Sequence, residues 1–365
     1  MIAPERGEQA AARTGELWCI TRKFPPGRGG MEVLSHELTT RIARRRRTRV
    51  VAASPGAMGL PGFLFASACR LLLGCARGSV AAVHLGDPVL APLSLIARAF
   101  RVPVAVTIHG LDVTYAHPLY RLWLRPFLRG IDACVCISEA ARRAAIDRGV
   151  TPGRASVIGI GIDAAAVPAS STVREDDLVL FVGRLVRRKG LAWFVADVLP
   201  ALASVRPRLR VVVVGDGPER GNVVEAAKRA GVLDRIELLG ALPDAQKWDW
   251  LARASLCILP NIPVDSDIEG FGIVALEAMA AGCPLLAADI EGLSEAVAGS
   301  DGARLLPAQD APAWRAALGE LLADRDLRDR LGPGGRRWVA KARGWDPVIE
   351  RYDAQFADLI ARRTR

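Results

Sequence analysis

No run of about 18 uninterrupted apolar residues occurs in the 365-residue sequence, and this excludes an ordinary membrane-spanning helix. The nearest candidate, residues 58–78, is interrupted by Arg70 and Arg77. The N-terminal residues carry charges at Glu5 and Arg6 instead of the apolar run of a signal peptide. We therefore expect a cytoplasmic location, which leaves contact with the inner face of the membrane open.

Signals for disulfides and for cysteine-based metal sites are also absent. The seven cysteines are an odd number, no two form a CxxC pair, and most lie in apolar runs such as residues 133–137. We interpret them as reduced cysteines of the core. With 51% hydrophobic and 24% charged residues, the chain is expected to fold into two globular domains of ordinary size.

The net charge of +10 is distributed unevenly along the chain. Residues 1–165 hold 22 basic and 11 acidic residues, whereas the remaining 200 residues hold 27 and 28. The excess positive charge therefore lies entirely in the first half. Such a one-sided field indicates contact with an anionic surface such as phospholipid, a lipid phosphate or nucleic acid.

Short apolar runs rich in valine and isoleucine alternate with helical patterns along the whole chain. Their length and spacing predict strands buried on both faces of parallel sheets. Two series of such runs, separated by a linker-like stretch at 163–176, predict an α/β protein with two doubly wound, Rossmann-like domains. The expected strands are 17–21, 49–54, 80–85, 104–108, 133–138 and 156–160, then 178–182, 210–214, 235–239, 256–259, 284–288 and 302–306.

The most informative segment reads Asp-Ile-Glu-Gly-Phe-Gly-Ile-Val-Ala-Leu-Glu and ends at Glu277. Gly270 and Gly272 allow the backbone to turn tightly, and a helix is expected to begin at Ile273. The free N–H groups at a helix start attract phosphate or sugar oxygens. Glu269 and Glu277 place two carboxylates at different depths along one ligand. The alternative interpretation is a solvated glutamate beside an ordinary glycine turn.

A second segment, residues 181–190, reads Phe-Val-Gly-Arg-Leu-Val-Arg-Arg-Lys-Gly. A buried strand ends at Gly183, and four cations follow within the next six residues. Arg184 offers a bidentate fork for a diphosphate and Lys189 a mobile point charge. We expect both on an exposed loop. A charge run of this kind is otherwise a solvated loop, but its place directly after a strand favours binding.

Two further segments of the first half place polar groups after predicted strands. Residues 21–32 form a glycine-rich turn that leads into a helix near Gly30, although neither a Walker loop nor GxGxxG is present. His109 follows the strand at 104–108 directly. A lone histidine is usually structural, but at the carboxyl end of a parallel strand it is a better site candidate.

Two other classes of function fit less well. Gly215 and Gly217 follow a strand as in nicotinamide-dependent dehydrogenases, but Pro218 comes next and Arg220 stands where that fingerprint needs a third glycine. A non-catalytic sugar-nucleotide-binding or nucleic-acid-binding module would use the basic half. No aromatic and basic RNA-binding motif occurs, so we expect no nucleic-acid partner.

Together the motifs resemble glycosyltransferase family 4, the large retaining family of the GT-B fold, over nearly the whole chain. The resemblance implies a nucleotide-sugar-dependent hexosyltransferase with its site in a cleft between the two domains. An inverting enzyme or an epimerase of the same fold would not share this set of loops. The matching motifs are Glu269-x7-Glu277, Gly183-Arg184 with Lys189-Gly190, residues 214–218, 24–32, His109-Gly110-x-Asp112 and residues 137–139.

The resemblance implies a role for each matching position. It places Arg184 and Lys189 as the diphosphate clamp, Glu277 as the ribose partner and His109 as the contact to the donor sugar. The implied catalytic set is His109, Glu269, Arg184 and Lys189. The implied donor-binding set is Gly30, Gly183, Arg184, Lys189, Glu269, Gly270, Phe271, Gly272, Ile273 and Glu277. Because the clamp supplies positive charge, we expect no obligatory metal and no cofactor besides the donor.

The chain departs from the family pattern at two places. The linker reads Gly159-Ile160-Gly161-Ile162-Asp163 where the family often has Pro-Asn-Gly-Val-Asp, so any role of that asparagine is absent. Glu291 stands where the family often has glycine, which adds a negative charge near the donor loop. We expect this charge to affect the choice of donor, whose nucleotide (UDP or GDP) and sugar the sequence leaves open.

The resemblance assigns the first domain to the acceptor. We expect residues 1–165 on the acceptor side, 166–344 on the nucleotide-sugar side, and a helix at 345–365 that returns to the first domain and buries Phe356 and Leu359. The basic residues predict a glycan or lipid-linked acceptor in cell-surface polysaccharide or glycolipid assembly, near an anionic membrane. A soluble acceptor is the alternative. The acceptor or membrane side is expected at Arg44, Arg45, Arg46, Arg47, Arg121 and Arg125.

Overall fold

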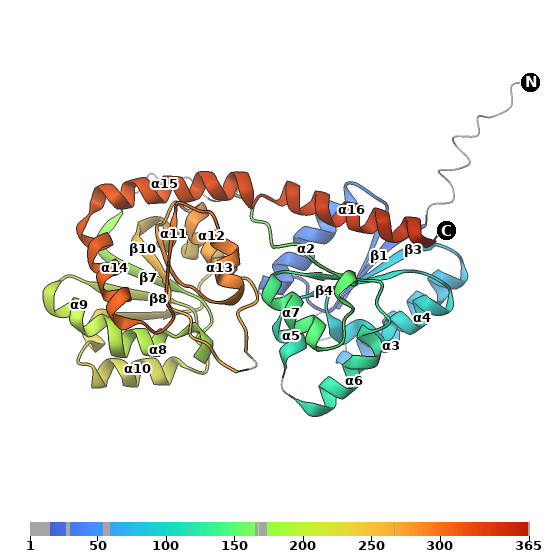
Figure 1. Ribbon diagram of the computed structural model, residues 1–365, viewed down its shortest axis with the longest axis horizontal. Coiled ribbons are helices and arrows are strands. Elements are labelled where there is room, and N and C mark those ends of the chain that lie inside the picture. The colour runs from blue at the N-terminus through green and yellow to red at the C-terminus, as the bar shows by residue number, and fades with distance from the viewer. Residues whose placement is uncertain are drawn as a thin grey trace, which may run out of the picture. The chain divides into compact units, whose positions relative to one another are not determined.

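The computed structural model describes residues 15–26, 30–53, 59–115, 117–164, 167, 174–265 and 267–363, except for the side chains of 118, 119, 121, 123, 362 and 363. The chain divides into two compact units (Figure 1). The first comprises Met1–Gly159 together with Val348–Arg365, and the second comprises Ile160–Pro347. Most of the expected linker at 163–176 lies outside the described residues.

The first unit is built on a six-stranded sheet in the order β2-β1-β3-β4-β5-β6, and every pair of neighbours is parallel. Hydrogen-bonded register pairs Trp18 with Arg49 on one side of β1 and with Val83 on the other. The strands are β1 (Glu16–Thr21), β2 (Thr48–Ala52), β3 (Val80–Leu85), β4 (Val104–Ile108), β5 (Ala133–Cys136) and β6 (Ala155–Val157).

The second unit repeats this architecture with the strand order β12-β11-β10-β7-β8-β9, again parallel throughout. Its strands are β7 (Glu175–Val182), β8 (Arg210–Val214), β9 (Ile236–Gly240), β10 (Ala254–Leu259), β11 (Leu285–Ala288) and β12 (Ala303–Leu306). All twelve strands expected from the sequence are therefore confirmed, with bounds that differ by a few residues at most.

Helices connect the strands of both units, as parallel pairing requires. In the first unit they are α2 (Gly30–Ala43), α3 (Leu60–Ala76), η1 (Pro88–Leu93), α4 (Ser94–Ala99), α5 (Leu111–Thr114), α6 (Pro118–Leu128), α7 (Glu139–Asp147) and η2 (Pro152–Arg154). In the second they are η3 (Arg187–Lys189), α8 (Leu191–Trp193), the π-helical η4 (Phe194–Val198), α9 (Leu199–Val205), α10 (Arg220–Arg229), η5 (Leu233–Arg235), α11 (Asp244–Arg253), α12 (Ile273–Ala280), α13 (Glu291–Val297), α14 (Ala311–Ala323) and α15 (Arg325–Ala342).

The central strands are apolar because helices cover both of their faces. Every residue of β3, β4 and β10 is buried, which explains why these segments read as continuous apolar runs rather than as alternating ones. No helix among the described residues is both long and apolar enough to cross a membrane.

The last helix, α16 (Trp345–Arg363), ends in the first unit. As expected, Phe356 and Leu359 are buried. His84 of β3 meets the rings of Phe356 and Tyr352 edge-on, at centroid distances of 5.4 and 6.4 Å. The C-terminal helix is thus part of the core of the first unit.

Strand order also determines where each sheet binds ligands. In the second unit the chain runs from β7 outward to β8 and β9, then crosses to β10 on the other side of β7. Adjacent strands with opposite onward directions form a topological switch point, beside whose carboxyl ends ligands bind in doubly wound sheets. The switch point of the second unit lies at β7 and β10, and that of the first lies at β1 and β3.

Candidate functional site

The loops after β7 and β10 meet in a buried ion pair. Lys189 Nζ lies 2.5 Å from Glu269 Oε2, and both side chains are less than a tenth exposed. The backbone enforces this contact, because Gly190 turns in the left-handed region at φ 65° and packs directly against the Pro260 carbonyl. The expectation that Lys189 lies on an exposed loop is wrong, since this turn directs its side chain inward.

Two residues that the sequence analysis did not single out complete the cluster around Glu269. Arg188 Nη1 donates to Glu269 Oε2 at 2.7 Å and its Nε to Asp267 Oδ1 at 2.9 Å. Asn261 Nδ2 donates to the same Glu269 oxygen at 2.8 Å. The basic run contained the signal for Arg188, but nothing in the sequence separated it from its neighbours. Asn261 follows β10 without any motif.

Charge compensation keeps Glu269 ionised although it is buried. Burial by itself raises the pKa of a carboxyl, but the charges of Lys189 and Arg188 outweigh this effect and hold the pKa of Glu269 below its ordinary value. Glu269 is therefore a fixed negative charge with a single protonation state near neutral pH. It is suited to orienting hydroxyl groups rather than to exchanging protons.

The second carboxylate of the motif, Glu277, lies in α12 and has its own partner. Lys247 of α11 reaches it, with 2.7 Å between Nζ and Oε1. Burial raises the pKa of Glu277 above its ordinary value, although Lys247 opposes this rise. Lys247 is a further polar residue of this edge that the sequence analysis missed.

Between the two carboxylates, the backbone presents free amides. Gly272 caps α12 in the left-handed region at φ 76°. The N–H groups of Gly270, Phe271, Gly272 and Ile273 donate to no acceptor among the described residues. Unpaired amides at the start of a helix make a site for anionic or hydroxyl oxygens.

Arg184 differs from Lys189 in its environment. It follows Gly183 at the end of β7, its side chain is exposed, and it forms no ion pair with any described residue. Gly183 donates its amide to Val214 at 2.9 Å, which holds the loop against the end of β8. Of the two expected clamp residues, Arg184 therefore has no ionic partner in the described part of the chain, whereas Lys189 is paired with Glu269.

Glu291 lies directly beside the donor-loop backbone. It begins α13 at φ 48°, a region that favours glycine, and its carboxylate accepts a hydrogen bond from the amide of Glu269. Burial and the neighbouring charge of Glu269 raise the pKa of Glu291, although that hydrogen bond opposes the rise. The extra negative charge expected from the sequence is therefore in contact with the loop that contains Glu269.

In the first unit, His109 lies at the carboxyl end of β4 and is 8% exposed. Its Nε2 contacts the Gly86 carbonyl at 2.9 Å, and because a carbonyl only accepts, Nε2 carries the proton. The remaining nitrogen, Nδ1, is thereby left as an acceptor in the neutral ring. The amide of His109 donates to Asp112 at 3.0 Å, and this bond fixes the turn.

The same edge of the first sheet contains a buried acid. Asp87 follows β3, is fully buried, and lies 2.9 Å from Nε of Arg22, which follows β1. Gly30 begins α2 nearby in sequence and is exposed, while residues 27–29 lie outside the described residues. Polar groups thus gather at the switch point of the first unit as well.

The basic residues expected on the acceptor or membrane side have different environments. Arg46 donates to Asp353 Oδ1 of α16 at 2.6 Å, and Arg45 lies 3.8 Å from Glu350. Arg44, Arg47 and Arg125 are exposed, and the side chain of Arg121 lies outside the described residues. Arg46 therefore holds the C-terminal helix. The four arginines at 44–47 precede β2, so they lie at the amino edge of the sheet, opposite the edge with His109.

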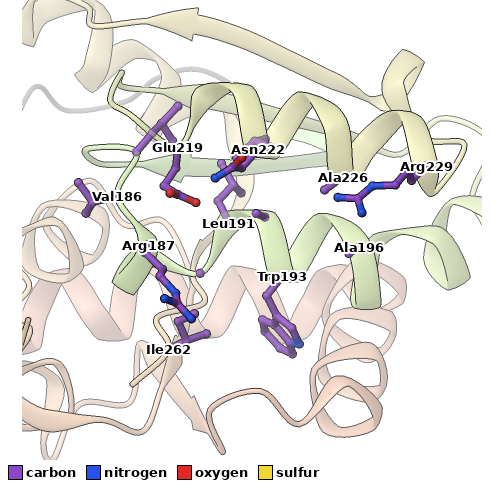
Figure 2. Close-up of a pocket in the computed structure, with 14 residues that line it drawn as sticks. Val186, Arg187, Leu191, Trp193, Ala196, Glu219, Asn222, Ala226, Arg229 and Ile262 are labelled. Carbon is purple, nitrogen blue, oxygen red and sulfur yellow. The ribbon is translucent and has the colours of Figure 1, made fainter. Parts of the chain in front are cut away.

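A cavity of about 300 Å³ opens behind the basic loop, between α8 and α10 (Figure 2). Arg187 and Trp193 border it from below and Glu219 and Asn222 from above. None of the expected donor-binding residues lines this cavity, although Gly190, which follows Lys189, does. Successive residues of the η3 turn therefore face different spaces, with Arg187 toward this cavity and Arg188 toward Glu269.

Comparison with known proteins identifies two family models that together match most of the chain. The model described as Glycosyltransferase Family 4 matches residues 9–166, and the model described as Glycosyl transferases group 1 matches residues 176–324. A phosphatidyl-myo-inositol mannosyltransferase of Mycolicibacterium smegmatis is 31% identical over 285 residues, which cover 76% of this chain and 69% of that protein. A GDP-mannose-dependent alpha-(1-6)-phosphatidylinositol monomannoside mannosyltransferase of Mycobacterium tuberculosis is 27% identical over 385 residues, covering 93% and 97%.

Solved structures show the same fold. A sucrose-phosphate synthase from Thermosynechococcus elongatus superimposes with a TM-score of 0.76 at 20% identity, covering 95% of this chain and 99% of that one. The Anabaena protein HepE in complex with UDP-glucose gives a TM-score of 0.74 at 18% identity, covering 94% and 99%.

Proposed function

The chain belongs to glycosyltransferase family 4 and has the GT-B fold of two Rossmann-like domains, and on that premise we propose that it is a retaining hexosyltransferase. The donor is a nucleotide diphosphate sugar bound at the carboxyl edge of the second unit. The observation that carries this proposal is the arrangement there of an exposed Arg184 and four amides without partners among the described residues, together with the buried carboxylate of Glu269 and the largely buried one of Glu277.

Each group has a distinct task in this proposal. Arg184 and the amides from Gly270 to Ile273 stabilise the negative charge that grows on the departing diphosphate. Glu277 accepts a hydrogen bond from the ribose, and Glu269 from the sugar. Lys189 acts mainly through Glu269, because the two side chains already neutralise each other.

Transfer then proceeds by attack on the same face from which the diphosphate leaves. The bond from the anomeric carbon to the phosphate oxygen breaks, the acceptor hydroxyl oxygen bonds to that carbon, and its proton passes to the leaving phosphate. No carboxylate nucleophile is needed. His109, with Nδ1 available as an acceptor, belongs to the donor-sugar side of the first unit in this proposal.

The proposed acceptor is a glycan or a lipid-linked molecule in the assembly of cell-surface polysaccharide or glycolipid. The names of both mannosyltransferase relatives include a phosphatidylinositol compound, and the name of one also includes GDP-mannose. GDP-mannose is therefore the first donor to test, beside UDP-linked sugars. The basic first half supports an anionic acceptor at a membrane.

Release of nucleotide diphosphate from GDP-mannose, UDP-glucose and UDP-N-acetylhexosamine tests the proposal. We expect Arg184→Ala to lower turnover with the accepted donor by at least about a hundredfold, because it removes charge stabilisation from the leaving group. The matched control is Arg187→Ala. Arg187 lies on the same loop but faces the cavity between α8 and α10, so its replacement should change turnover less than about twofold. Activity should persist in EDTA, since the chain supplies the positive charge. Near-normal turnover of Arg184→Ala would contradict the proposed role.

A further inference from the structure

The outer face of α3 in the first unit is apolar along the length of the helix. Phe65 is 73% exposed and Leu72 is 48% exposed, and the spacing of Phe65, Cys69, Leu72 and Ala76 places all four in one stripe. The opposite face, with Phe63 and Leu71 among its residues, is buried against the unit.

This pattern is the reverse of what a surface helix ordinarily shows. A helix that covers a sheet directs its polar residues outward, whereas the exposed residues of α3 are apolar with the single exception of Arg70. The neighbouring α4 also exposes an apolar side chain, Leu95, at 57%, and the exposed Phe100 follows this helix (Figure 1). Contiguous exposed apolar surface of this kind marks an interaction site.

The helix α3 and the chain that flanks it in sequence carry no acidic residue. From Leu38 to Gly86 the chain has eight arginines and not one Asp or Glu. The next acid, Asp87, is fully buried. Arg70 and Arg77 are exposed and form no ion pair with any described residue.

Backbone hydrogen bonds place the 44–47 arginines near the end of the same helix. The start of β1 is hydrogen-bonded to the segments that precede β3 and β2. Glu16 N donates to Ser79 O, and Leu17 N donates to Arg47 O. Ser79 follows α3 closely in sequence, so the end of the apolar stripe, Arg77 and Arg47 lie at one edge of the sheet. The apolar stripe therefore runs into a basic rim.

We propose that this face of α3 docks the protein on an anionic phospholipid bilayer. Phe65, Leu72 and Leu73 enter the boundary between headgroups and acyl chains, and Arg70 and Arg77 contact lipid phosphates. An anionic bilayer matches a helix that carries Arg70 and Arg77 and no acidic residue, whereas a second copy of the chain would set these arginines against each other. The proposal deepens the membrane-side acceptor of the proposed function, but vesicle binding itself requires no catalysis.

Flotation of the full-length protein with vesicles tests the proposal. We expect binding to phosphatidylglycerol-containing vesicles and at least about tenfold weaker binding to phosphatidylcholine vesicles, because basic residues sense the anionic surface. Raising the salt concentration should weaken binding without abolishing it, since only the ionic part is screened. Failure to bind phosphatidylglycerol vesicles at low salt would overturn the proposal.

A matched pair of double variants distinguishes vesicle binding through the α3 surface from nonspecific binding through any exposed apolar residue. Phe65→Gln/Leu72→Gln should lower binding by about tenfold or more, and its folding should be intact because both side chains are exposed. Val205→Gln/Leu233→Gln, which replaces exposed apolar residues of the second unit, should bind as the unchanged protein does. Equal binding by the α3 variant would overturn the proposed surface.

Cys69 allows the contact itself to be observed. It is the one exposed cysteine among the seven, and it lies in the apolar stripe. An environment-sensitive fluorophore on Cys69 should shift to shorter wavelength with phosphatidylglycerol vesicles and not with nucleotide sugar. A shift that occurs without vesicles and depends on protein concentration would show that this face binds a second copy of the chain. That result would overturn the proposed docking on a bilayer.

Donor turnover without vesicles distinguishes this proposal from the proposed function. Phe65→Gln/Leu72→Gln should release nucleotide diphosphate at the rate of the unchanged protein in solution. Loss of vesicle binding with unchanged donor turnover would support the proposal that α3 is the membrane-docking surface. Intact vesicle binding in a protein that accepts no nucleotide sugar would contradict only the proposed function.

Discussion

Lys189 and Glu269 illustrate how a residue's burial changes the meaning of a mutation. Both side chains lie inside the second unit, and the charge of each compensates that of the other. Removing a charge from an exposed loop would affect ligand binding alone. Removing one from this pair also leaves an uncompensated charge in the protein.

We therefore expect Lys189→Met to lower the free energy of unfolding by about 3 kcal/mol, because Glu269 keeps its charge and loses its main partner. The double variant Lys189→Met/Glu269→Gln should recover most of this loss, since it removes both charges, but should remain inactive. Urea unfolding of the single and double variants measures the coupling between the two residues. Additive effects on stability would show that the pair is not coupled.

Arg184 is the contrasting residue on the same loop. It is exposed, as expected from the sequence, and forms no ion pair with any described residue, while its role in turnover stays a prediction. Arg188, in contrast, is bound within the protein, because it bridges Asp267 and Glu269. Neighbouring basic residues of this loop therefore have different environments because the backbone directs their side chains to different places.

At the scale of elements, β3 and α16 meet around a buried histidine. His84 Nε2 lies 2.8 Å from Thr107 Oγ1, and its ring packs edge-on against Phe356. Burial, with a smaller contribution from His109, lowers the pKa of His84 to about 4. The folded first unit therefore prefers a neutral His84 where the unfolded chain binds a proton.

This difference predicts an acid-sensitive contact between strand and helix. Because the pKa of His84 is lower in the folded state, its contribution to stability is complete above about pH 6.5 and is lost as the pH falls toward 4, by up to about 3 kcal/mol. His84→Gln should be less stable at pH 7.5 but should lose less stability between pH 7 and 4.5. Urea unfolding at several pH values measures this, and parallel pH profiles of the two proteins would contradict it.

The element α3 shows how one sequence feature acquires a different meaning in three dimensions. In the sequence, Arg70 and Arg77 interrupt an apolar run and argue against a membrane-spanning helix. In the structure, the same run is a helix whose inner face is buried against its own unit, which leaves a second apolar face exposed. Because α3 is apolar on two faces and its own unit covers only one of them, the other apolar face stays exposed.

At the scale of the whole molecule, the two proposals assign different ligands to the two units. The proposed donor site lies at the carboxyl edge of the second unit, and the proposed membrane surface lies on α3 of the first. All of the net positive charge belongs to the first half of the chain. The two proposals therefore predict effects in different parts of the protein.

Donor binding should stabilise the protein by about 2.7 kcal/mol at a concentration one hundred times its dissociation constant. Thermal unfolding with GDP-mannose and with UDP-linked sugars should identify the accepted donor as the one that raises the melting temperature. Hydrogen exchange should show protection at residues 183–190 and 267–277, whereas anionic vesicles should protect α3. Protection of α3 by the donor alone would contradict this division of roles.

The sequence by itself determined the twelve strands, the two parallel sheets and the family, because buried parallel strands read as short apolar runs and the ligand loops follow them directly. It also placed Glu269, Glu277 and Arg184 at the edge where such sheets bind ligands. Only the tertiary structure decided that Lys189 is buried, that Arg188, Asn261 and Lys247 complete the site, and that Arg46 holds α16. The reason is physical: strand formation follows from local periodicity, whereas the partner of a charged side chain depends on contacts between segments that lie far apart in the chain.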